Sequence, residues 1–148
     1  MTNQFTPLVQ KYATKYGIPF EILCGLIERE SGWDQYCIRF EPQFYQEYVI
    51  PLMNSKRITN ITEAEARAMS WGLMQPLLET AREFGYSGPA AQLCDPETGL
   101  DIGCKILANK LKSAQDLESG LLRWNGGSNK QYGAEVIALA AKYKTPTA

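Results

Sequence analysis

Prolines and glycines divide the sequence into short helical segments, and the clearest of these segments covers residues 19–30. Pro19 suits the first turn of a helix. Apolar residues follow it at helical spacing, namely Phe20, Ile22, Leu23, Leu26 and Ile27. Gly32 then ends the helix. The same combination of period and turn residues recurs along the chain, so the sequence predicts a protein built from short helices.

Further helices are expected wherever this pattern recurs. Their expected ranges are 6–15, 41–49, 62–69, 76–84, 95–111, 117–124 and 132–143. Thr62 and Glu65 fit a capping box, and Asp95 before Pro96 fits an N-cap. Residues 34–40 and 54–61 are interpreted as loops, and no segment alternates as a strand would. We therefore expect an all-α fold, a compact bundle of short helices forming a single domain over residues 1–148.

Composition excludes several classes of function. A net charge of −1 carries no signature of nucleic-acid binding. No apolar run is long enough for membrane insertion, and the polar start Met1–Phe5 is no signal peptide. The absence of histidine removes Ser-His-Asp and Cys-His catalysis and every His-ligated metal site. We expect a monomer without cofactor or metal, in which catalysis depends on carboxylates, hydroxyls and backbone.

The four cysteines, Cys24, Cys37, Cys94 and Cys104, contain no C-x-x-C pair, which argues against a zinc site. Three disulfide pairings would be possible among them. Because no export signal is seen, they are interpreted as free buried thiols.

Glu30 is the candidate catalytic acid. It falls in the last turn of the expected helix 19–30, where the helix dipole disfavours an ionised carboxylate. A carboxyl there, beside Trp33 and an apolar face, is a candidate for a raised pKa and for general-acid chemistry. The other interpretation is a surface glutamate near a helix end.

Four short motifs follow one another along the chain. They are Glu30-Ser31, Gly72-Leu73-Met74-Gln75, Asp95-Pro96 with Asp101-Ile102-Gly103 and Leu107, and Trp124-Asn125-Gly126-Gly127. In this order they resemble the catalytic domain of the soluble lytic transglycosylases, a lysozyme-like family. Each motif alone is weak, but four in order over most of the chain are a strong signal.

The resemblance implies cleavage of the β-1,4 bond between N-acetylmuramic acid and N-acetylglucosamine in peptidoglycan, giving 1,6-anhydromuramic ends. Glu30 would be the general acid and base, kept protonated by burial against Trp33 or Trp71. The substrate-binding residues it implies are Ser31, Ser70, Met74, Gln75, Trp124 and Asn125. For Ser31 and Ser70 the alternative is an ordinary helix-end or turn hydroxyl.

Two features depart from the family pattern. Trp124 stands where the family usually has a tyrosine that contacts the catalytic carboxyl, and an indole can donate but not accept. Glu30 and Gly72 are also 42 positions apart, longer than is usual. The extra segment carries Phe40-Glu41, similar to a Phe-Glu in some phage-type muramidases. Glu41 is therefore either a second active-site carboxylate or an acid at a helix start.

These departures leave alternative functions open. One is a hydrolytic muramidase of the phage endolysin type that uses Glu41, and another is a peptidoglycan-binding module without activity. Without a signal peptide, we expect a protein made in the cytoplasm that reaches the cell wall by phage lysis or through a secretion or injection machine. Phage or bacterial origin and exo- or endo-action stay open.

Overall fold

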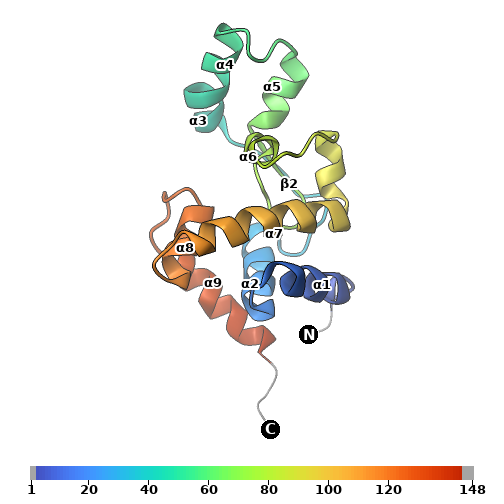
Figure 1. The fold of residues 1–148 in the computed structure, drawn as a ribbon, viewed down its shortest axis with the longest axis vertical. Coiled ribbons are helices and arrows are strands. Elements are labelled where there is room, and N and C mark those ends of the chain that lie inside the picture. Colours follow the sequence, from blue (N-terminus) through green and yellow to red (C-terminus); the bar gives the residue numbers. More distant parts are fainter. Residues whose placement is uncertain (1–2, 145–148) are drawn as a thin grey trace.

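The computed structural model describes residues 3–144 and has two unequal lobes, one above the other in Figure 1. The larger lobe is helical, as its hydrophobic periodicity predicted. It contains α1 (Thr6–Tyr16), α2 (Phe20–Ser31), α7 (Pro96–Lys112), α8 (Leu117–Trp124) and α9 (Tyr132–Ala140), which a 3₁₀ turn (Ala141–Tyr143) extends.

Helix α2 lies at the centre of the larger lobe, against α1 and α9. Its apolar residues, which include Leu23, Leu26 and Ile27, are fully buried in the main core. Gly32 ends the helix in the left-handed conformation, as predicted. The end of α2, and with it Glu30, therefore has a rigid support.

The smaller lobe carries α3 (Pro42–Phe44), a π-helical turn (Tyr45–Val49), α4 (Ile50–Asn54) and α5 (Ile61–Arg67). The helix expected at 41–49 thus continues to Asn54. The predicted capping box is wrong, because the side chain of Asn60, not Thr62, accepts the hydrogen bond from the Glu63 amide at 3.0 Å. A separate small cluster that includes Val49 and Ala64 forms the interior of this lobe.

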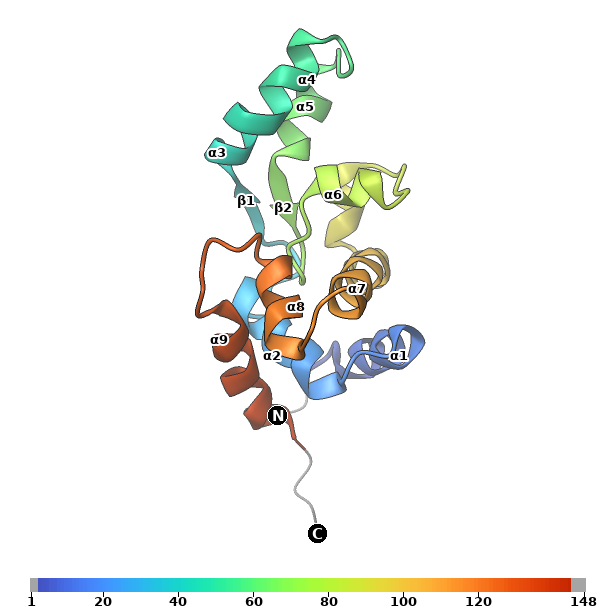
Figure 2. The ribbon, with the colours of Figure 1, turned by 60° about the vertical axis from the view of Figure 1, so that its left-hand side comes forward.

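A short antiparallel sheet connects the lobes (Figure 2). Strand β1 (Ile38–Phe40) pairs with β2 (Met69–Trp71), with Arg39 opposite Ser70. The prediction of no strand was wrong here, and the helix expected to reach Met69 ends at Arg67. Each strand has three residues and β1 is exposed throughout, so neither shows an alternating apolar pattern.

Helix α6 (Leu78–Glu83) and a 3₁₀ turn (Ala90–Cys94) complete the chain between the sheet and α7. The helix begins two residues after the predicted Pro76. Leu78 and Ala81 pack with Trp71 and Leu93 in a third buried cluster. The small sheet does not change the fold class: the protein is all-α and lysozyme-like, as predicted.

The four cysteines are free, in agreement with the thiol interpretation. Cys24, Cys94 and Cys104 are buried, whereas Cys37 is only half-buried. Burial raises the pKa of the Cys24 and Cys104 thiols to about 12.

Candidate active site

A groove of about 640 Å³ runs between the two lobes, and Glu30 is among the residues that line it. Tyr48 lines it from the smaller lobe, Ser70 from the sheet, Ile106 from α7 and Asn125 from the loop after α8. Figure 2 shows this loop rising beside the base of β1. The groove is therefore walled by segments that are far apart in the sequence.

The carboxyl group of Glu30 is held from one side. Its side chain is only 9% exposed. Oε1 accepts a hydrogen bond from Trp124 Nε1 at 3.2 Å and a second one from the Tyr132 hydroxyl. Oε2 lies 3.7 Å from Nη2 of Arg39. Because a carboxylate oxygen has about two acceptor positions, Oε1 is saturated and Oε2 is the oxygen free to carry a proton.

The pKa of Glu30 is raised, chiefly because burial penalises the charged carboxylate. The hydrogen bonds from Tyr132 and Trp124 and the charges of Arg39 and Arg29 oppose this effect without cancelling it. A raised pKa agrees with the prediction made from the position of Glu30 in the chain.

The indole beside Glu30 is not one of the two that were expected there. Trp33 donates its N–H to the Tyr143 hydroxyl at 3.0 Å, and Trp71 donates to the Ala66 carbonyl at 3.2 Å. Trp124 instead provides the indole contact. Trp124, which replaces the family's tyrosine, therefore still forms a hydrogen bond to the Glu30 carboxyl, although its indole can only donate.

Tyr132 is a site residue that the sequence analysis missed. It is the first residue of α9, 1% exposed, and its ring lies 5.8 Å below the Arg29 guanidinium. Burial and the nearby charge of Glu30 raise the pKa of its phenol, so the hydroxyl keeps its proton and remains a donor. Nothing in the sequence distinguishes Tyr132 from the other tyrosines.

Arg39 lies between Glu30 and Glu41. Its Nε donates to Glu41 Oε1 at 2.8 Å, while Nη2 faces Glu30. Glu41 directly precedes α3 but makes no side-chain cap on it. Both glutamates line the groove, with one guanidinium between their carboxylates. Glu41 thus lies at the start of α3, as the helix-start interpretation expected, and it also lines the groove.

The segment Gly72–Gln75 forms a tight structural turn. Gly72 has φ +71°, and a Cβ there would lie 2.4 Å from the Leu93 carbonyl oxygen. Met74 is fully buried, its Sδ 3.8 Å from Cys104 Sγ. The expectation that Met74 lines the groove is wrong, because its side chain fills core space against α7.

Ser31 does not contact Glu30 or the groove. Its hydroxyl lies 2.8 Å from the Leu73 carbonyl oxygen and 3.2 Å from that of Ile27. It therefore ties the end of α2 to the Gly72–Gln75 turn, which is closer to the helix-end interpretation than to a substrate contact.

Four of the expected binding residues do line the groove: Ser70, Gln75, Trp124 and Asn125. Gln75 has φ +55° and donates from Nε2 to the carbonyls of Cys37 and Gly72, both at 2.8 Å. Its Oε1 is buried and has no hydrogen-bond partner among residues 3–144. Asn125 Oδ1 accepts from the Asn129 amide at 3.0 Å, so Asn125 also organises the loop before α9.

Among residues 3–144, no cluster of three histidine, cysteine or acidic side chains could hold a metal ion. In the same part of the chain, no helix is both long enough and apolar enough to cross a bilayer.

The family model of the transglycosylase SLT domain matches residues 7–143. The chain therefore belongs to this family of lysozyme-like peptidoglycan lytic transglycosylases. No curated protein and no solved structure was found to match it.

Proposed function

We propose that this protein cleaves the bond between N-acetylmuramic acid and N-acetylglucosamine with Glu30 as both acid and base. The observation that carries this proposal is the buried Glu30 carboxyl with a raised pKa, which lines the groove and whose Oε2 accepts no hydrogen bond within residues 3–144. A raised pKa favours the protonated carboxyl, which can donate its proton to the glycosidic oxygen as the bond breaks.

The proposed reaction needs only one protein carboxylate. Glu30 gives its proton to the leaving oxygen, and the acetamido oxygen of the muramic acid attacks C1 as the C1–O bond breaks. The ionised Glu30 then removes the proton of the 6-hydroxyl, whose oxygen attacks C1 and displaces the acetamido oxygen. The product is a 1,6-anhydro ring, and Glu30 regains its proton.

Substituting Glu30→Gln tests the assignment, because an amide keeps the size of the side chain but has no transferable proton. We expect clearing of cell walls in a zymogram to slow by roughly a hundredfold or more. Clearing at a near wild-type rate would show that another residue is the acid.

The alternative is a muramidase in which Glu41 activates water. An inverting hydrolase keeps its carboxylates about 6.5 to 9.5 Å apart to leave room for that water. Here the Arg39 guanidinium lies between Glu30 and Glu41, which favours the anhydro product. Mass analysis of the digested muropeptides distinguishes the two reactions, because the anhydro product and the hydrolysed product differ by one water. A main product that ends in muramic acid with a free reducing end would support hydrolysis. Glu41→Gln should then abolish activity.

We also propose that the protein acts on the cell wall after release by phage lysis or delivery by a secretion or injection machine. Fractionation of the producing cells before and after lysis or injection would test this proposal. Wall-bound protein with no such event would contradict it.

A further inference from the structure

A second groove of about 480 Å³ adjoins the one that contains Glu30. Lys110, Arg123 and Gly126 line both, so the two grooves are continuous. The second groove lies over the C-terminal ends of α7 and α8 and the glycines of the following loop. Nothing in the cleavage mechanism above uses this end.

Two cations, Lys110 and Arg123, lie at the end that the two grooves share. In the described part of the chain, neither Lys110 nor Arg123 forms an ion pair. Arg123 is held in place, because Nη1 donates to the Ser113 carbonyl at 2.6 Å and to the Ser113 hydroxyl at 2.8 Å. Its other N–H groups make no hydrogen bond within residues 3–144. A held guanidinium is well suited to bind a carboxylate, since little side-chain freedom is lost.

The opposite wall of the groove, on the smaller lobe, contains acidic residues. Glu41 and Glu47 line it from the smaller lobe, and Glu41 is paired with Arg39, which also lines the groove. Glu47 accepts a hydrogen bond from Gln43 at 2.9 Å and has no cation partner among the described residues. The groove therefore attracts an anion on the α7–α8 side and disfavours one on the side of the smaller lobe.

Building on the proposed function, we propose that Lys110 and Arg123 form a subsite for the carboxylates of the peptide stem carried by N-acetylmuramic acid. The hydroxyls and acetamides of the glycan are uncharged, so they cannot form an ion pair with Lys110 or Arg123. The stem extends from the muramic acid and carries carboxylate groups. The charge difference between the walls then orients the strand, with its stem toward α7 and α8.

Direct binding tests this subsite without requiring turnover. The full-length chain with Glu30→Gln is titrated with two soluble muropeptides that differ only in the stem D-glutamate, as the free α-carboxylate or the α-carboxamide. An uncharged chitooligosaccharide is the third ligand. We expect the carboxylate form to bind about 3- to 10-fold more tightly than the amide, and added salt to reduce the difference.

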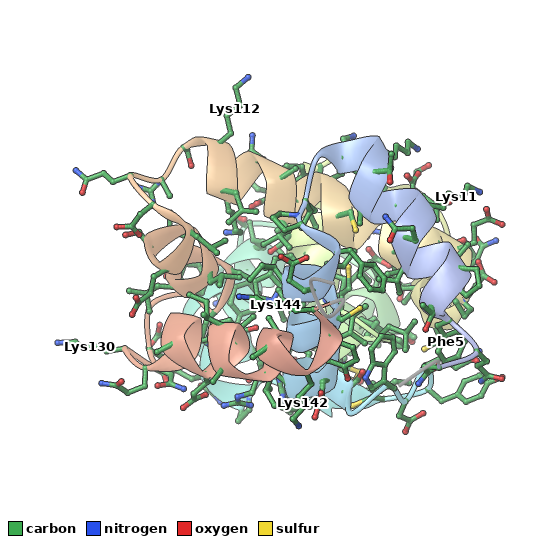
Figure 3. All side chains as sticks on the ribbon, turned by 90° about the horizontal axis from the view of Figure 1, so that it is seen from below. Phe5, Lys11, Lys112, Lys130, Lys142 and Lys144 are labelled. Atoms are coloured by element: carbon green, nitrogen blue, oxygen red, sulfur yellow. The ribbon has the colours of Figure 1, made fainter. Side chains whose placement is uncertain are left out.

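Lys110→Met keeps most of the aliphatic side chain and removes the charge. It should reduce the preference for the carboxylate to less than about twofold. Lys112→Met is the matched control, since Lys112 also lies in the last turn of α7 but lines neither groove. Figure 3 shows its side chain projecting away from the molecule. This variant should keep the preference.

Equal affinity for the carboxylate and the amide would overturn the subsite, and so would an equal loss of preference in the Lys112→Met control. Arg123→Gln removes the other positive charge of the subsite and should likewise reduce the preference for the carboxylate. Circular dichroism checks that this variant, which loses the contacts to Ser113, is still folded. If the chain binds neither muropeptide nor chitooligosaccharide, the proposed function fails together with the subsite. If it binds both without regard to charge, only the subsite fails.

Discussion

The indole Nε1 of Trp124 donates a hydrogen bond to Oε1 of Glu30 across 3.2 Å. An indole can only donate, so it cannot take the Glu30 proton, and it favours the ionised form of the carboxyl. The Tyr132 hydroxyl occupies the same oxygen from α9. Together the two donors fix the position of Oε1, while Oε2 faces Arg39 at 3.7 Å.

Glu30→Gln should change the pH dependence of stability. Since the folded pKa of Glu30 is raised, its stabilising contribution is full below the unfolded pKa and is lost as the pH rises through the folded pKa. Glutamine does not titrate, so the variant should gain stability relative to wild type between acidic and neutral pH. The gain is about 1.4 kcal/mol per unit of pKa shift. Denaturant unfolding at several pH values measures it, and a pH-independent difference would contradict the raised pKa.

Tyr132→Phe should move the pH–rate profile. Removing a donor that favours the carboxylate raises the pKa of Glu30 further, so the alkaline limb, where the acid loses its proton, shifts to higher pH. We also expect roughly a tenfold lower maximal rate from the lost orientation. Tyr143→Phe is the control, because that hydroxyl donates to Glu28 at 2.6 Å, and Glu28 does not line the groove. A shift of the same size in the control would refute the specific role of Tyr132.

Trp124→Tyr should keep activity within about tenfold of wild type, because a phenol hydroxyl can donate to Glu30 as the indole does. Trp124→Phe keeps an aromatic ring but has no donor, and it should lose more activity. Turbidity clearing of purified cell walls compares the variants. If Trp124→Phe were as active as wild type, the indole hydrogen bond would have no part in the reaction.

The free cysteines give a fourth prediction. The thermal unfolding temperature should be the same with and without reductant, because no disulfide contributes to stability. In the native protein a thiol reagent should modify Cys37 first, since the other three cysteines are buried. Unfolding should expose all four. A lower unfolding temperature in reductant would reveal a disulfide and contradict the structure.

The main helices could be predicted because their determinants are local. Asp95 caps α7 by accepting from the Thr98 amide at 2.9 Å, three residues away, and the apolar period of α2 is visible in its own residues. The position of Glu30 near the end of α2 followed from the same local signals. Its candidacy as the acid then needed only the four motifs in their order along the chain.

The surroundings of Glu30 depend on tertiary structure. Tyr132 and Trp124 lie 102 and 94 positions from Glu30, and Arg39 reaches it from a three-residue strand whose partner, β2, follows only after the smaller lobe. Met74 is part of a motif that resembles a binding segment, yet the packing of α7 buries it. A helix end or a cap is determined by residues within one turn of the chain. A burial environment and its hydrogen-bond donors are determined by whichever distant segments fold against it.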